Sequence, residues 1–154
     1  MNDDSYSYEQ NPHKGNKGIT RAIKASINSW HGLQFAIKEE SAFRQELTLT
    51  ALLLPISLVL PVSRAEHILL LMVVILVLII ELLNSSVEAA IDRISFDNHG
   101  LSKRAKDYGS AAVMLALLLC IFTWIYILIP VIKNLKVSFI NDSTLICHLY
   151  ETFA

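Results

Sequence analysis

One stretch of the sequence places acidic residues directly after a long hydrophobic run. Thirteen consecutive apolar residues, 68–80, lead into a polar series made of Glu81, Asn84, Ser85, Glu88 and Asp92. At about 100° per residue, these five side chains fall within roughly 80° of one another on a helix. An ionised group inside a membrane costs roughly 2.5 kcal/mol or more on insertion scales, so it is retained where it has a function. This acidic stripe therefore predicts a reactive site near the end of a membrane span.

The depth of the stripe indicates which chemistry it can support. If the helix enters the hydrocarbon near His67, a rise of ~1.5 Å per residue places Glu81 roughly 20 Å into a core about 30 Å thick, and Glu88 at its boundary. A carboxylate shielded from water can act as a general base. Glu88 and a second carboxylate, which we expect at Glu39 or Glu40, can bind Mg²⁺ together with the phosphates of a nucleotide. Simpler readings stay open: Glu81 as a structural acid, and Glu39 and Glu40 as a solvated face.

The composition indicates a membrane protein with one domain. The chain has 154 residues, of which 53% are hydrophobic, and its mean hydropathy is +0.46. These values are too apolar for an ordinary soluble protein of this size. The two cysteines, Cys120 and Cys147, suggest neither a disulfide framework nor a metal site. We expect no cleavable signal peptide, because the first stretch of the sequence is polar.

The sequence contains no motif of the soluble nucleotide-binding folds. Both G-x-x-x-x-G-K-[ST] and G-x-G-x-x-G are absent, and the segment Gly15-Asn16-Lys17-Gly18 matches neither. Other residues can contact a nucleotide, namely Lys106-Asp107 at the entry of the last apolar run and Asp97 and His99 in a polar loop. A positive-inside anchor for the first pair and solvent exposure for the second are the alternatives.

The apolar segments predict an all-α membrane protein with one surface helix and three spans. From Thr20 to about Gln45, apolar residues that include Trp30 recur at helical spacing, as in an amphipathic helix that lies among lipid headgroups. The last run, 111–132, has 22 residues without a charge. We predict one domain at 19–133 that contains a surface helix at 20–45, spans at 47–62, 66–94 and 109–132, and a polar loop at 95–106, between a flexible tail at 1–18 and a C-terminal tail at 134–154.

The distribution of basic residues predicts the orientation in the membrane. Six of the thirteen Lys and Arg residues precede the first apolar run, and four more lie within 93–106. Short loops rich in these residues stay in the cytoplasm. We therefore expect a cytoplasmic N-terminus and 93–106 loop, and a C-terminal tail on the outside.

Three blocks of sequence resemble the small integral-membrane diacylglycerol kinases of bacteria. They are ESAFRQE at 40–46, ELLNSSVEAAIDR at 81–93 and LSKRAKDYGSAA at 101–112. Their order and spacing are similar to the family from about residue 20 to residue 132. The tails at 1–18 and 134–154 extend beyond the family core, and we assign them no role.

The resemblance implies a homotrimer in the bacterial inner membrane that transfers the γ-phosphoryl group of MgATP to the hydroxyl of diacylglycerol, which gives phosphatidic acid for phospholipid recycling. No nucleic-acid partner is implied. Glu81 would be the catalytic base and Asn84 its positioning neighbour, while Glu40 and Glu88 would hold the Mg²⁺ ion. The nucleotide site would contain Arg21, Asn28, Glu40, Glu88, Asp97, Asn98, His99, Lys106 and Asp107. The lipid site would contain Arg21, Trp30, Phe43, Arg44, Gln45, Glu46, Glu81 and Ser110.

Two other functions compete with this prediction. An undecaprenol kinase of the same fold is the nearer one, although the stretch 102–109 looks more like the diacylglycerol branch. The second is a proton-coupled or structural membrane protein, in which Glu81 would be a relay carboxylate. That function leaves unexplained why Glu88 and Asp92 continue the acidic stripe toward Lys106.

Overall fold

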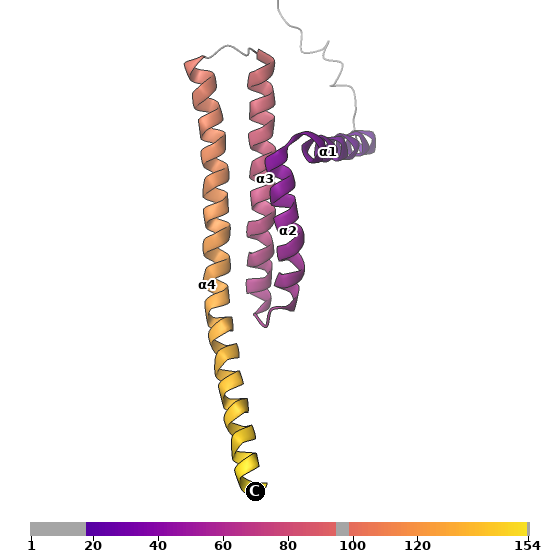
Figure 1. Cartoon of the computed structure of the whole chain (residues 1–154). Helices are drawn as coiled ribbons and strands as arrows, with labels where there is room; N and C mark the ends of the chain where they lie inside the picture. Colours follow the sequence, from indigo (N-terminus) through magenta and orange to yellow (C-terminus); the bar gives the residue numbers. More distant parts are fainter. Residues whose placement is uncertain (1–17, 95–98, 154) are drawn as a thin grey trace, which may run out of the picture. The chain divides into compact units, whose positions relative to one another are not determined.

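The computed structural model describes residues 18–94 and 99–153, and side chains as far as Val137. The described residues form four helices and no strand: α1 (Ile19–Glu39), α2 (Ser41–Val59), α3 (Arg64–Ile94) and α4 (Gly100–Phe153) (Figure 1). Three of these helices contain stretches long and apolar enough to cross a membrane, at Ser41–Val59, Arg64–Ile94 and Gly100–Val137. The predicted all-α membrane fold with three spans is confirmed.

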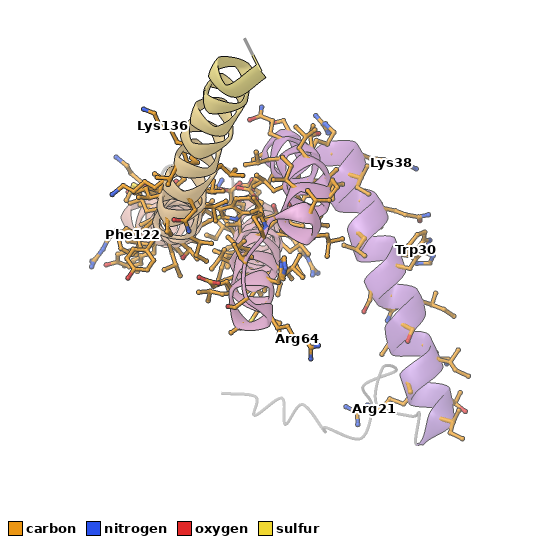
Figure 2. All side chains as sticks on the ribbon, turned by 90° about the horizontal axis from the view of Figure 1, so that it is seen from below. Arg21, Trp30, Lys38, Arg64, Phe122 and Lys136 are labelled. Carbon is orange, nitrogen blue, oxygen red and sulfur yellow. The ribbon has the colours of Figure 1, made fainter. Side chains whose placement is uncertain are left out.

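The chain divides into two compact units, with the boundary between Glu39 and Glu40. The described part of the first unit consists chiefly of α1, along which Arg21, Trp30 and Lys38 are labelled in Figure 2. Most of its large apolar side chains are exposed, and Trp30 keeps 62% of its surface accessible. Exposed apolar side chains are what a helix on a membrane surface presents to lipid. The surface location of α1 stays a prediction.

The predicted surface helix at 20–45 differs from the structure, because the helix is interrupted at Glu40. This residue has extended backbone angles, φ −93° and ψ 111°, and is the N-cap of α2. From there a new buried face begins, on which Phe43, Thr50 and Ser57 follow one another at seven-residue spacing. Apolar residues recur at helical spacing on both sides of the break, so the periodicity alone did not reveal it.

The turn between α2 and α3 satisfies its own backbone groups. Pro61 has no N–H to donate to the carbonyl of Ser57 four residues earlier, and the Nδ1–H of His67 donates to that oxygen instead, at 2.6 Å. Ser63 and Glu66 form a reciprocal capping box at the start of α3. The Ser63 N–H donates to Glu66 Oε2 at 2.8 Å, and the Glu66 N–H donates to Ser63 Oγ at 3.3 Å. These hydrogen bonds therefore stabilise the connection between α2 and α3.

We expect the substitution Ser63→Ala to lower the free energy of unfolding by about 1 kcal/mol, because it removes the acceptor that caps α3. Denaturant titration of the purified protein in detergent micelles measures this loss. Ser29→Ala is the matched control, since the Ser29 hydroxyl only donates to the Ala25 carbonyl on an exposed face of α1. Equal effects of the two substitutions would contradict a capping role for Ser63.

The hydrophobic core of the second unit lies along the seam between α3 and α4. From α3 it takes Leu70, Val73, Val74 and Val77, and from α4 it takes Ala116, Cys120, Trp124 and Ile127. Each set recurs at three- or four-residue spacing, which places it on one helix face. Trp124 therefore lies in the core, with 7% of its surface exposed. The outward faces carry exposed apolar side chains such as Phe122 (Figure 2).

The last helix extends at both ends beyond the predicted span at 109–132. It begins at Gly100, where Nδ1 of His99 accepts the Leu101 N–H at 3.3 Å and the His99 carbonyl accepts the Lys103 N–H at 3.0 Å. The end of the predicted polar loop and the predicted tail are therefore helical where the structure describes them. Pro130 lies inside the helix without ending it. Hydropathy locates the lipid-crossing part of a helix, and it does not detect polar turns that continue the same helix.

Candidate active site

Glu81 faces the inside of the second unit and not the lipid. Its exposed fraction is 4%. It follows Val74 and Val77 at helical spacing, so it continues the face of α3 that forms the core. A carboxylate in this position is shielded from water by protein, which is the environment that the sequence predicted for a general base.

Other carboxylates lie within electrostatic range of Glu81. Glu88 on α3 and Glu40 at the start of α2 both act on Glu81, and Glu81 in turn acts on Glu46 of α2. Oε2 of Glu46 is buried and has no hydrogen-bond partner. We refer to Glu40, Glu46, Glu81 and Glu88 as the acid cluster. Like charges at close range in a low-dielectric site repel strongly, so the cluster favours a cation or a proton among its members.

Asn84 contacts the outer part of the acid cluster and the last helix. Its Nδ2 group donates to Oε1 of Glu88 at 3.3 Å, one helical turn further along α3. Its Oδ1 atom is buried and has no hydrogen-bond partner. The same oxygen faces the backbone of Gly109 on α4, and a Cβ atom at position 109 would overlap it. The contact between the two helices is therefore backbone against amide at this level.

An ion pair joins the outer end of the acidic stripe to the start of α4. Lys106 Nζ lies 2.5 Å from Asp92 Oδ1, with 38% and 44% of the two side chains exposed. The pair bridges the end of α3 and the beginning of α4, which are separated in the sequence by the five residues 95–99. It holds Lys106 at the more exposed end of the stripe. The predicted stripe continued through Asp92 toward Lys106, and the structure joins these two side chains directly.

The other predicted site residues lie in different environments. His99 caps α4 through Nδ1, Asp107 and Ser110 are exposed on α4, and Phe43 is buried. Arg44 and Gln45 are exposed on α2. Arg21, Asn28 and Trp30 belong to α1 in the first unit. Asp97 and Asn98 lie outside the described residues.

The donor set for a cation consists of carboxylate oxygens. Within the part of the chain that the structure describes, no group of three or more His, Cys, Asp or Glu side chains is arranged as a complete metal site. Glu40 makes no capping hydrogen bond with its side chain, so its carboxylate is not committed to the helix end. Mg²⁺ is usually bound through one or two carboxylates with substrate phosphates and water completing the shell. Glu40 and Glu88 are carboxylates of the type that such an incomplete site uses.

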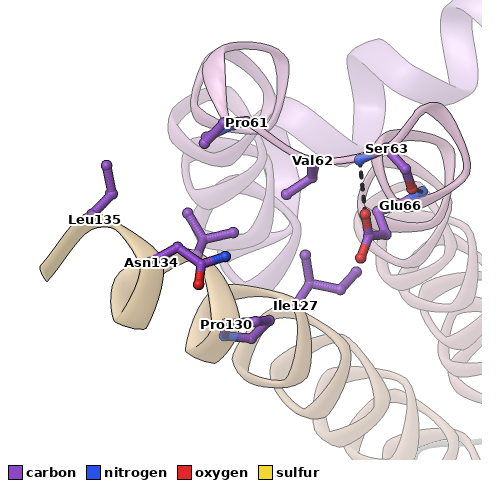
Figure 3. Close-up of a pocket in the computed structure, with 9 residues that line it drawn as sticks. Pro61, Val62, Ser63, Glu66, Ile127, Pro130, Asn134 and Leu135 are labelled. Carbon is purple, nitrogen blue, oxygen red and sulfur yellow. Dashed lines mark hydrogen bonds between the residues drawn. The ribbon is translucent and has the colours of Figure 1, made fainter. Parts of the chain in front are cut away.

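Among the described residues of the second unit, cavities lie at each of two levels of the helices. A narrow one of about 20 Å³ extends from Glu46 along α2, α3 and α4 to Val74 and Cys120. A wider one of about 410 Å³ lies near the α2–α3 turn, between that turn and the stretch 127–135 of α4 (Figure 3). Its acidic residue, Glu66, is committed to the capping box through the Ser63 N–H. The wider cavity is therefore separate from the acid cluster.

Together, the apolar helices and the acid cluster define a multi-pass α-helical membrane protein with a polar site enclosed by its own helices. The sequence profile described as prokaryotic diacylglycerol kinase matches residues 27–128. Relatives named diacylglycerol kinase from Pseudomonas aeruginosa, Escherichia coli K12 and Haemophilus influenzae are 46%, 47% and 44% identical over 118, 111 and 107 residues. The aligned parts cover 77%, 72% and 70% of this chain and 96%, 91% and 91% of the relatives.

The chain belongs to the prokaryotic diacylglycerol kinase family, which confirms the resemblance found in its sequence. It is accordingly an enzyme with a kinase function. The alternative of a proton-coupled or structural protein does not account for this membership. The matched region contains the acid cluster, Asn84 and Lys106.

Gly109 is the residue that sequence reasoning missed. A glycine within a helix is unfavourable by about 1 kcal/mol relative to alanine, so one inside a predicted helix calls for a packing reason. That signal was present in the block 101–112. Its meaning depended on which side chain of α3 would lie opposite, and only the folded structure supplies Asn84.

Proposed function

We propose that this protein transfers the γ-phosphoryl group of MgATP to the hydroxyl of 1,2-diacylglycerol and releases phosphatidic acid and ADP. In this reaction Glu81 accepts the proton of the lipid hydroxyl. The hydroxyl oxygen bonds to the γ-phosphorus while the bond from that phosphorus to the β–γ bridging oxygen breaks. Asn84 keeps the carboxylates of α3 in position relative to the phosphate donor.

The observation that carries this proposal is the burial of Glu81 within electrostatic range of Glu40 and Glu88. A base that serves a lipid hydroxyl must be shielded from water, and the phosphate donor must reach it from the aqueous side. Glu81 is buried, and the same stripe continues through half-buried Glu88 to partly exposed Asp92. Phosphoryl transfer depends mainly on alignment and on neutralising phosphate charge, so a base, a cation and a lysine suffice.

Glu40 and Glu88 are the residues that would hold Mg²⁺ in this proposal. Bound there, the ion would neutralise charge on the phosphates of ATP. Without the ion, the two carboxylates would still attract positively charged groups to the outer side of Glu81. The absence of a side-chain cap hydrogen bond at Glu40 and the hydrogen bond from Asn84 to Glu88 support this division of roles.

We further propose that the protein lies in the bacterial inner membrane as a homotrimer, with its N-terminus in the cytoplasm and its C-terminus outside. The basic residues before the first span and within 93–106 support this orientation. It brings Lys106 and the outer acids to the side of the membrane where ATP is present. The trimer is inferred from the family resemblance of the sequence.

An assay with radiolabelled ATP in mixed micelles tests the proposed reaction. Diacylglycerol and undecaprenol are offered in separate micelles, and the labelled lipid product is extracted and counted. Label in phosphatidic acid supports the proposal. Label in undecaprenyl phosphate alone would assign the chain to the other substrate, and no labelled lipid in either arm would overturn the kinase proposal for these acceptors.

We expect the substitution Lys106→Gln to raise the KM for ATP about tenfold, because it removes a charge-assisted contact to phosphate. Steady-state kinetics with ATP varied at saturating diacylglycerol measure the change. Lys103→Gln is the matched control, since Lys103 is an exposed lysine one turn earlier on the same helix. An equal rise in KM for both variants would indicate a general effect of positive charge and contradict a specific role for Lys106.

A further inference from the structure

Gly109, which has no role in the proposed mechanism, lies against Asn84, which has one. The three atoms nearest to a Cβ built on Gly109 all belong to Asn84. They are Oδ1, which the Cβ would overlap, Cγ at 3.2 Å and Cα at 3.8 Å. An alanine at position 109 must therefore displace the Asn84 amide or separate α3 from α4 at this level.

The displaced group is the amide that holds Glu88 of the acid cluster. Asn84 donates through Nδ2 to Glu88, while its Oδ1 is held against α4 without a hydrogen-bond partner. Burying an unpaired amide oxygen is unfavourable, so this orientation persists only because neighbouring atoms enforce it. The bare backbone of Gly109 is the surface that Oδ1 meets.

We infer that Gly109 is a positioning residue of the active site, which acts through Asn84. The missing side chain at position 109 lets the amide lie flat against α4 and aim Nδ2 at Glu88. This inference rests on the proposed function, in which the carboxylates of α3 must stay in register with the phosphate donor.

The substitution Gly109→Ala tests this role. A shift of reacting groups by about 1 Å can cost up to 100-fold in rate, and we expect the kcat for diacylglycerol phosphorylation to fall about tenfold or more with the KM for ATP changed less than about twofold. The split matters because Lys106 lies one turn before Gly109 on α4. If alanine instead pushed α4 away as a whole, Lys106 would move with it and the KM for ATP would rise, which would overturn the inference.

The double variant Asn84→Ala/Gly109→Ala shows whether Gly109 acts through Asn84. Truncation of Asn84 removes Oδ1 and Cγ, so the alanine at position 109 then keeps only the ordinary contact with Cα at 3.8 Å. We expect the double variant to have the kcat of Asn84→Ala, because the two losses share one cause. Losses that multiply would overturn the inference, since independent sites combine in that way.

Two further measurements keep these outcomes distinct. Gly100→Ala is the matched control, because a Cβ at that position on the same helix meets nothing within 4 Å, and it should leave kcat unchanged. If Gly109→Ala fails to fold, the double variant should fold, and its failure to do so would overturn the inference. A wild-type protein that does not phosphorylate diacylglycerol refutes the proposed function, whereas an active wild type with independent losses refutes only the role of Gly109.

Discussion

We expect the substitution Glu81→Gln to lower the kcat for diacylglycerol phosphorylation by at least about 100-fold, the range in which a general base contributes. Glutamine has nearly the same shape as glutamate but cannot accept the proton of the lipid hydroxyl. Glu81 is 4% exposed, and in the proposed function the nucleotide binds further out along the stripe. The affinity for ATP should therefore change little. Single-turnover kinetics and equilibrium titration with a nucleotide analogue measure the two quantities separately.

The stability of the same variant distinguishes a catalytic base from a structural acid. The carboxylates of Glu40, Glu46 and Glu88 lie within electrostatic range of Glu81, so removal of its charge relieves repulsion. We expect Glu81→Gln to unfold in detergent no more readily than wild type while it loses turnover. A structural acid would show the opposite pattern, with lost stability and retained turnover.

The control for this substitution lies on the same helix. Glu66→Gln makes the same chemical change in the capping box at the start of α3, where glutamine also serves as the partner of Ser63. It should retain wild-type turnover. Wild-type turnover in Glu81→Gln itself would refute the assignment of Glu81 as the base.

The sequence predicted the existence of the spans better than their boundaries. Long apolar runs identify hydrocarbon-crossing segments because charged residues are expensive there. The break at Glu40 and the start of α4 at Gly100 depend on local backbone groups, which hydropathy does not describe. The His99 cap and the extended angles of Glu40 are determined by hydrogen bonding and by packing that begins at Phe43.

The site was predictable to the extent that it lies on one helix. The spacing of Glu81, Asn84 and Glu88 places them on one face of α3 whatever the tertiary structure is. Which residues of α2 and α4 lie opposite that face depends on how the helices pack. Glu46 therefore entered the prediction through family resemblance alone, and Gly109 did not enter it.

The ion pair of Lys106 illustrates the same limit for charged residues. Asp92 and Lys106 are 14 positions apart and meet because α3 and α4 lie side by side. The sequence placed Asp92 on the acidic stripe and Lys106 at the entry of the last span. It could not show that Asp92 and Lys106 form an ion pair. This ion pair brings a positive charge to the outer acids.

The second large effect concerns the outer acids. We expect Glu88→Gln to raise the Mg²⁺ concentration needed for half-maximal turnover about 100-fold or more, because even loss of a residue that only supports a metal ligand costs 10- to 100-fold in affinity. Glutamine at position 88 still accepts the hydrogen bond from Asn84 Nδ2, so the register of α3 is retained. Turnover measured across a Mg²⁺ titration at fixed ATP gives the shift. Excess Mg²⁺ should restore much of the lost rate.

Glu40→Gln and Glu39→Gln complete this experiment, because the sequence left both acids open as the second ligand. Glu40 acts electrostatically on Glu81, whereas Glu39 is exposed at the end of α1. We expect Glu40→Gln to shift the Mg²⁺ titration in the same direction as Glu88→Gln, and Glu39→Gln to leave it in place. A titration unchanged by Glu88→Gln would exclude a ligand role for that residue. A shift with Glu39→Gln alone would move the second ligand from Glu40 to Glu39 at the end of α1.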